Sequence, residues 1–290
     1  MERDSLRRFL FERLGVRGEW VRLDHTWRAA LAHVEYPPVV RDTLGEAFAA
    51  LGMLSVALKS RGSLTLQVSG AGLIPLLVVQ SRGERALRGM ARWQSDELLD
   101  AGGSLFGDDA QLALTLDPGT GRERYQGVVE IDSGHVAGAL EHYFERSEQL
   151  ATRLWLASDE SAAVGLMLQA IPGEHAETQD WERLSLLAGT LTRQELLGWN
   201  VDTLLRRVFA EDDIRLFDSE PMRYQCDCSR ERAVAILLGL GETEVEEILA
   251  EQGRVEMHCE FCRAGYLFDA VDVGAVFSRT PASSADSSTH

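Results

Sequence analysis

The sequence predicts an α+β fold in three parts: an N-terminal domain of mainly antiparallel sheets with helices, a helical linker, and a small C-terminal zinc-binding module. Short stretches of alternating apolar and polar residues, separated by turn signals, fill much of the chain up to Pro172-Gly173. After that point the pattern is helical. All four cysteines lie near the C-terminus, in two close pairs. Because hairpins outnumber strand–helix alternations, a doubly wound parallel sheet is disfavoured.

The N-terminal domain is expected over residues 1–174. A short strand at 20–24 precedes a helix that begins near His25. A long helix follows Pro37-Pro38, because apolar residues then recur every three or four positions and proline suits the first helical turn. Gly70-Ala-Gly72 is predicted to form a hairpin turn. A helix is expected at 136–148, and further strands at 63–69, 74–80, 87–93, 111–116, 126–131, 152–157 and 163–171.

The linker is expected over residues 175–218, and we expect it to be metastable. Its helices are short and amphipathic, so they need another surface to be stable. Candidate N-caps are Thr178, Thr192 and Asp202, with Glu182 near the first and Glu195 near the second, as a capping box would have them. We therefore expect a docked connector without a core of its own.

The metal module is expected over 219–277, with one helix after Cys228 and a second over 242–251, separated by a break at 239–241. It carries twelve Asp and Glu against five Arg. The Ser-rich tail, 278–290, is expected to be disordered.

The cysteines give the strongest chemical signal. Cys226-Asp-Cys228 is followed by thirty residues and then by Cys259-Glu-Phe-Cys262. Two short pairs separated by one foldable segment are typical of a tetrathiolate site, and four thiolates in tetrahedral reach favour Zn²⁺. The sequence therefore predicts one Zn²⁺ per chain, held by Cys226, Cys228, Cys259 and Cys262. A thiolate that holds zinc is also one that an oxidant can attack.

The bulk composition excludes several classes of function. The formal net charge of −17 argues against a general nucleic-acid or anionic-membrane binder, since both need a basic face. The charged start lacks the apolar core of a secretory signal, and cysteines confined to one cluster suit a reducing compartment, so the expected location is cytoplasmic. Hydrolase, nucleotide-binding and metalloprotease motifs are absent, so no catalytic or cofactor-binding residues and no enzymatic activity are predicted.

Longer stretches resemble one family. The cysteines lie within Cys226-Asp-Cys228-Ser-Arg-Glu-Arg232 and His258-Cys-Glu-Phe-Cys262, and Tyr266-Leu-Phe268 follows them. Matching blocks occur in the same order in the N-terminal half, at 16–18, 59–67, 87–89, 143–149 and 165–172. On these residues nearly the whole chain resembles the bacterial redox-regulated holdase chaperone, the thirty-three-kilodalton heat-shock protein family.

The resemblance implies a redox-regulated, ATP-independent holdase that functions in the response to oxidative stress. The reduced form would be an inactive, zinc-bound monomer. Oxidation would form the disulfides Cys226–Cys228 and Cys259–Cys262, release zinc and unfold the linker. The oxidised protein would then form a homodimer, bind unfolding client proteins and prevent their aggregation.

Other interpretations stay open on the residues alone. A structural zinc-ribbon protein could mediate protein or nucleic-acid interactions without a redox switch, although the acidic module disfavours nucleic acid. A thiol oxidoreductase would use Cys259-Glu-Phe-Cys262, but this motif does not follow the first strand of a thioredoxin-like unit. His258 is either an alternative ligand or an exposed neighbour. Three arginines near the thiols either lower the pKa values of the thiols or form ordinary ion pairs: Arg230, Arg232 and Arg263.

Overall fold

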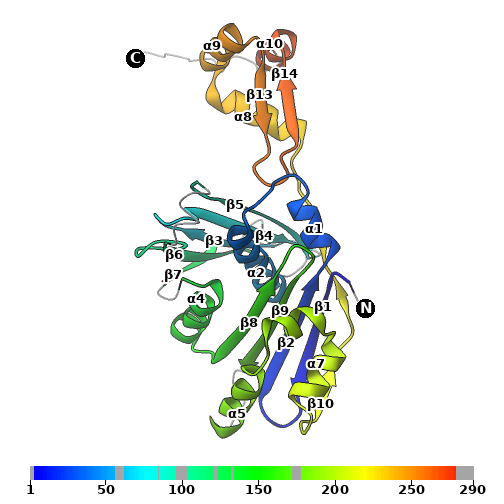
Figure 1. Ribbon diagram of the computed structural model, residues 1–290. Coiled ribbons are helices and arrows are strands. Elements are labelled where there is room, and N and C mark those ends of the chain that lie inside the picture. The colour runs from blue at the N-terminus through cyan, green and yellow to red at the C-terminus, as the bar shows by residue number, and fades with distance from the viewer. Residues whose placement is uncertain are drawn as a thin grey trace, which may run out of the picture. The chain divides into compact units, whose positions relative to one another are not determined.

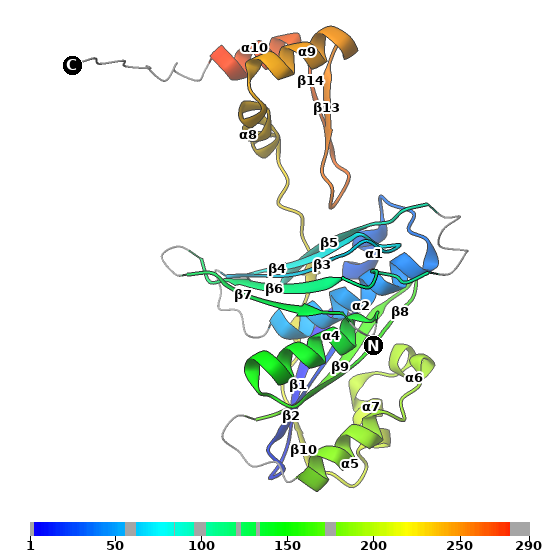
Figure 2. The same ribbon diagram turned by 90° about the vertical axis from the view of Figure 1, so that its left-hand side faces the viewer.

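A computed structural model describes residues 3–55, 62–83, 85–95, 103–119, 123–131, 134–171 and 178–278 (Figures 1 and 2). The chain divides into two compact units, Met1–Gln225 and Cys226–His290, and each is considered by itself. The predicted tail lies outside the described residues except for Ser278. Part of the 59–67 block, residues 59–61, lies outside them too.

The first unit contains two antiparallel-rich sheets and two groups of helices, as the α+β prediction required. Its helices are α1 His25–Leu31, α2 Pro38–Leu54, α4 Val136–Tyr143, the π-helical turn η2 Phe144–Glu148, α5 Thr178–Ala188, α6 Arg193–Gly198 and α7 Val201–Val208. Its strands are β1 Ser5–Phe11, β2 Val16–Leu23, β3 Ser63–Ser69, β4 Leu76–Arg82, β5 Ala86–Arg92, β6 Gln111–Asp117, β7 Tyr125–Glu130, β8 Thr152–Ser158, β9 Ala163–Ala170, β10 Ile214–Leu216, β11 Glu220–Pro221 and β12 Arg223–Tyr224.

The two sheets join distant parts of the chain. The first has the order β10-β1-β2-β9-β8, and β11 also pairs with β1. The second has the order β12-β5-β4-β3-β6-β7. All pairings are antiparallel except the short parallel contact between β12 and β5. The segment 214–224 therefore adds edge strands to both sheets.

Helix α2 forms the centre of the unit and lies between the two sheets (Figure 2). Twelve of its seventeen residues are buried, because it packs against a sheet on each side. Phe48 and Leu51 are fully buried in this core. Pro38 occupies the first turn, where its missing N–H costs no helical hydrogen bond. Burial on all sides explains why the helix is apolar well beyond one stripe.

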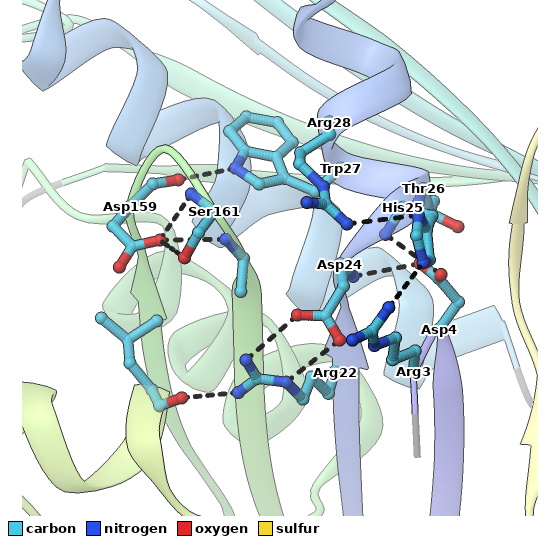
Figure 3. Close-up of polar contacts among 12 residues, drawn as sticks. Arg3, Asp4, Arg22, Asp24, His25, Thr26, Trp27, Arg28, Asp159 and Ser161 are labelled. Atoms are coloured by element: carbon cyan, nitrogen blue, oxygen red, sulfur yellow. Dashed lines mark hydrogen bonds and ion pairs between the residues drawn. The ribbon is translucent and has the colours of Figure 1, made fainter. Parts of the chain in front are cut away.

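The polar contacts around α1 tie three segments together (Figure 3). Asp4 accepts hydrogen bonds from the backbone N–H groups of Asp24, His25 and Thr26 at 2.7–3.0 Å, and so caps a helix that lacks a cap of its own. The indole Nε1 of Trp27 donates to the carbonyl oxygen of Asp159 at 2.7 Å. These contacts fix α1 relative to β1 and to the turn between β8 and β9.

The linker helices α5, α6 and α7 cover the face of the first sheet that points away from α2 (Figure 2). Their apolar residues pack with Phe9, Phe11 and Trp20, and the rings of Phe11 and Phe209 meet edge to face at 5.0 Å. Strand β9 is consequently buried on both faces. The packing explains how such short helices form, since the sheet supplies the surface that they need.

Polar contacts also hold the linker. The predicted capping box is confirmed: the Thr192 side chain accepts from the backbone of Glu195, and the carboxylate of Glu195 accepts from the backbone of Thr192. Asp202 was expected to cap α7, but Asn200 does so, because the helix begins at Val201. Arg22, with a side chain 10% exposed, is held by Asp24 (Figure 3) and donates to the carbonyl oxygen of Leu197 at 2.5 Å.

The three-part division into 1–174, 175–218 and 219–277 stays a prediction, since it concerns which parts lose structure separately. In the folded state the linker belongs to the first unit. The contacts divide the chain after Gln225, because β11 and β12 pair with β1 and β5.

A partly buried carboxyl group on α2 makes the stability of this unit depend on pH. Burial raises the pKa of Glu46 on α2 to about 7, and the charge of Asp42 adds to the shift. The ordinary pKa of a glutamate is 4.5. The ionised carboxylate therefore lowers the stability of the folded state progressively as pH rises from 4.5 to about 7, and it has no such effect below pH 4.5. We expect Glu46→Gln to raise the free energy of unfolding at pH 8 by roughly 1–2 kcal/mol and to leave it unchanged near pH 4.

Urea unfolding of both proteins at the two pH values measures this difference. Glu130→Gln is the matched control, because Glu130 is exposed and its neutralisation should change little at either pH. An equal gain in the free energy of unfolding from Glu46→Gln at both pH values would contradict the raised pKa of Glu46.

Candidate metal centre

The second unit is small and has a correspondingly small core. It contains α8 Arg230–Leu240, α9 Glu242–Gln252, β13 Val255–His258, β14 Gly265–Phe268 and α10 Ala270–Ser278 (Figure 1). Helices α8 and α9 agree with the two helices predicted around the break at Gly239–Gly241. Six buried apolar residues form the core: Ala233, Leu237, Val245, Val255, Phe268 and Val273.

Two separate segments bring the cysteines together. Cys226 and Cys228 lie just before α8, whose N-terminus is capped by Ser229, with the hydroxyl accepting from the N–H of Arg232. Cys259 and Cys262 lie in the turn of the β13–β14 hairpin, where His258 pairs with Gly265. The hairpin register therefore fixes one pair of cysteines, and the start of α8 follows directly after the other.

The four sulfur atoms form one cluster. Their Sγ atoms all lie within 4.8 Å of one another, and all four residues are half-buried. Cys226 Sγ is 3.6 Å from Cys259 Sγ, and Cys228 Sγ is 3.2 Å from Cys262 Sγ. Four sulfurs placed tetrahedrally around Zn²⁺ at 2.3 Å would be about 3.8 Å apart. The arrangement therefore fits a tetrathiolate metal site, and the structure brings together every ligand predicted from the sequence.

The electrostatics of the cluster favour a bound cation. Burial raises the pKa of the Cys262 thiol, and contacts with the other three cysteines raise it further. The backbone N–H of Ala264 acts in the opposite direction by donating to this sulfur. Four sulfurs this close can all be deprotonated only where a cation offsets their mutual repulsion. Zinc, when bound, would supply that positive charge.

The hairpin turn is shaped to present its thiols. The N–H of Arg263 donates to the carbonyl oxygen of Cys259 at 2.8 Å, and the N–H of Cys259 donates to that of Ala264 at 2.9 Å. Arg263 has a φ of 55°, in the left-handed region. This conformation turns the backbone so that the next N–H, that of Ala264, points to Cys262.

Tyr266 is a site residue that the sequence did not single out for a role. Its hydroxyl forms a hydrogen bond with Cys228, which raises the pKa of Tyr266 to about 12. Tyrosine two positions after a turn on an exposed hairpin has no distinctive spacing, so only the fold reveals this contact.

Two charged neighbours of the cysteines, Arg230 and His258, have structural partners. Arg230 forms an ion pair with Asp272 at 2.8 Å, donates to the carbonyl oxygen of Leu267 at 2.9 Å and lies over the ring of Phe268. It therefore joins α8 to β14 and α10. His258 is exposed, with Nε2 3.4 Å from a carboxylate oxygen of Glu256, and is not part of the cysteine cluster. The interpretation of His258 as an exposed neighbour fits this geometry.

Comparisons with known proteins agree with the site. Residues 4–269 match the family model described as Hsp33 protein. The "33 kDa chaperonin" of Nitrosococcus oceani is 47% identical over 276 residues, covering 95% of both chains. That of Shewanella oneidensis is 40% identical over 284 residues, covering 98% of this chain and 99% of the relative.

A solved structure shows the same fold. The crystal structure of the 33 kDa chaperonin from Thermotoga maritima aligns with a TM-score of 0.79 at 22% identity, over 95% of this chain and 98% of that one.

Among the described residues, no helix combines the length and apolar character needed to cross a bilayer. The match of the family model over nearly the whole chain, together with relatives at 40–47% identity, shows that this chain belongs to the Hsp33 family of chaperones.

Proposed function

We propose that this chaperone is a redox-regulated, ATP-independent holdase. In the reduced state Cys226, Cys228, Cys259 and Cys262 hold one Zn²⁺ and the protein is inactive. Oxidation forms the disulfides Cys226–Cys228 and Cys259–Cys262, ends zinc binding and unfolds the linker. The exposed apolar surface then binds unfolding client proteins. The observation that carries the proposal is the cluster of four thiols within 4.8 Å in a unit with only six buried core residues.

The chemistry of the switch follows from the sulfurs. A peroxide that oxidises two thiols to one disulfide takes two electrons and two protons and leaves as water, so the four thiols consume two equivalents. A disulfide sulfur no longer offers the anionic lone pair that metal binding requires. The two sulfur contacts described above join the two motifs, whereas the proposed disulfides join cysteines within each motif, so oxidation would replace contacts between the motifs with bonds inside each of them.

Loss of the cluster should destabilise the second unit. Structural zinc sites contribute about 10–16 kcal/mol in finger-type peptides, and small domains seldom have a core that replaces such a contribution. Four of the six core residues are alanine or valine, and the two larger ones are Leu237 and Phe268. We infer that the unit loses its fold on oxidation.

The covalent chain carries this effect to the linker. Cys226 lies two residues after β12, which pairs with β5 through Arg223 and Tyr224 only. Strand β11 is also two residues long. These short edge strands are the attachments between the linker and the cysteine segment, so disorder that begins at Cys226 meets little resistance before it reaches β10.

Release of the linker would expose apolar surface on two sides. The helices would expose Leu184, Leu196 and Leu204. The sheet would expose the residues that these helices now cover: Phe9, Phe11, Trp20, Val164, Leu166 and Leu168. Large exposed apolar patches typically mark surfaces that bind other proteins. Client binding needs no nucleotide in this account, and the acidic net charge of −17 keeps complexes soluble.

The remaining parts of the proposal follow the family. The protein acts in the cytoplasm during oxidative stress, is a monomer when reduced and a homodimer when oxidised, and is not an enzyme. Its partners are unfolded or partly folded proteins, not nucleic acids or membranes.

The metal site leads to a stoichiometry that can be measured. The reduced protein should contain one Zn²⁺ per chain by elemental analysis, with all four thiols protected from a thiol reagent until the metal is chelated. Cys259→Ser removes one of four ligands and should lower zinc affinity by roughly two orders of magnitude or more. His258→Ser is the matched control at the adjacent, exposed position and should keep full affinity. Zinc content near zero in the reduced wild type would remove the metal site from the account.

The holdase activity leads to a second prediction. The oxidised protein should suppress light scattering by a thermally unfolding enzyme without ATP, whereas reduced and re-reduced samples should suppress it poorly. The reason is that the apolar face of the first sheet under the linker helices becomes available only when the linker detaches. Equal activity in reduced and oxidised samples would leave a zinc-stabilised chaperone without a redox switch, and inactivity in all samples would refute the holdase assignment.

A further inference from the structure

A cavity of about 410 Å³ lies in the first unit, between its two sheets and below α4 and η2. Its walls are mainly apolar and come from α2, β3, β6, η2 and β9: Met53, Leu64, Leu114, Leu116, Phe144 and Met167. A space of this size accommodates a large apolar side chain together with its peptide group. None of these residues takes part in the thiol cluster.

One end of the cavity is polar, and one carboxylate oxygen there lacks a hydrogen-bond partner among the described residues. Glu19 on β2 is 5% exposed, and its Oε2 has no hydrogen-bond partner among the described residues. Burial raises the pKa of this group to about 7. Beside it, Arg17 donates from Nη2 to Oε1 of Gln169 at 2.6 Å, and Gln169 donates to Thr152 at 2.9 Å. An unpaired buried carboxyl is costly unless a donor from elsewhere satisfies it.

Three of the blocks that carry the family resemblance meet at this cavity. The block 16–18 contributes Arg17, the block 143–149 contributes Tyr143, Phe144 and Glu148, and the block 165–172 contributes Met167 and Gln169. The second block includes the π-helical turn η2, and Gln149 ends it in the left-handed conformation. Such turns are often found at functional sites. The switch uses none of these residues, so their convergence needs another explanation.

We propose that this cavity receives an apolar side chain of an unfolded client segment, and that Arg17 and Glu19 bind the peptide group beside that side chain. The inference rests on the proposed holdase function and adds to it the place where client chains are held.

Arg17 and Glu19 together offer the hydrogen-bond donor and the acceptor that a peptide group needs. Arg17 and Glu19 are two residues apart on one strand, so their side chains leave the same face of the sheet about 6.5 Å apart at the backbone. A guanidinium donates and a carboxylate accepts, while a peptide group presents a carbonyl oxygen and an N–H. The long flexible walls of Met53 and Met167 adapt to side chains of different shape, as a chaperone requires.

Methyl NMR tests the cavity directly in the full-length, zinc-loaded protein. The probe is N-acetyl-phenylalanine amide, and N-acetylglycine amide is the control that lacks a side chain. We expect the probe to shift the methyl signals of Met53 and Met167 in a saturable manner, while Met257, in the other unit, stays unchanged. Unchanged Met53 and Met167 signals would overturn the proposal whether or not the protein is a holdase.

Two variants connect the cavity to clients. Leu116→Trp fills the cavity, and Val128→Trp is its control, because Val128 is exposed on β7 and does not line the cavity. Leu116→Trp should weaken probe binding roughly tenfold and lower the holdase capacity of the oxidised protein, whereas Val128→Trp should change neither.

Glu19→Met keeps the length of the side chain but removes the hydrogen-bond acceptor. It should raise the urea midpoint, since a buried carboxyl is lost, and should still weaken probe binding.

The outcomes separate the two proposals. Binding that weakens while stability rises cannot result from misfolding, so Glu19→Met decides the matter even if Leu116→Trp fails to fold. If wild-type protein is an active holdase and Leu116→Trp and Glu19→Met keep full capacity, the client assignment of the cavity is wrong. If oxidised wild-type protein is inactive, the holdase proposal fails, and the probe titration still reports on the cavity.

Discussion

The close approach of four cysteine sulfurs is the interaction on which the second unit depends. It joins the segment before α8 to the β13–β14 hairpin turn, two parts of the chain that are thirty residues apart. The core of that unit is small, and Arg230 adds the main polar link between α8 and the rest. In the proposed switch, thiolates are at once metal ligands and the groups that oxidants attack, so the atoms that hold the unit together would also make its stability sensitive to oxidation.

The first sheet has two apolar faces, and this fits the proposal that a well-packed linker detaches on oxidation. Helix α2 covers one face from within a large core, whereas the short helices α5 to α7 cover the other. Without the linker, the domain keeps α2, both sheets and most of its buried residues. Among the described residues, the apolar side chains of the linker helices pack against the sheet and against one another. Under the proposed switch, aromatic residues such as Phe11 and Trp20 would be core in one state and accessible surface in the other.

Much of this could be predicted from the sequence where the pattern is local. The helix α2, the strand β3 and the Thr192–Glu195 capping box follow from periodicity and cap chemistry, and the four ligands follow from cysteine spacing. Strand β1 was not predicted, because its arginines mask the alternation and its pairing with β10 and β11 is distant in sequence. The π-helical end of the 136–148 helix and the Tyr266–Cys228 contact also depend on tertiary packing. The same holds for the cavity, since its walls come from eight separate elements.

Hydrogen exchange on the reduced and oxidised protein tests the central claim most directly, because it follows each segment in both states. The account predicts that oxidation removes protection from about His175 to Phe277, while α2 and the strands up to Pro172 keep theirs, and that reduction with zinc restores the original pattern. Exchange should increase in the second unit no later than in the linker, because the thiols are the site of the chemical change. Protection that is unchanged across the chain, or that is lost first in the sheets around α2, would contradict the account.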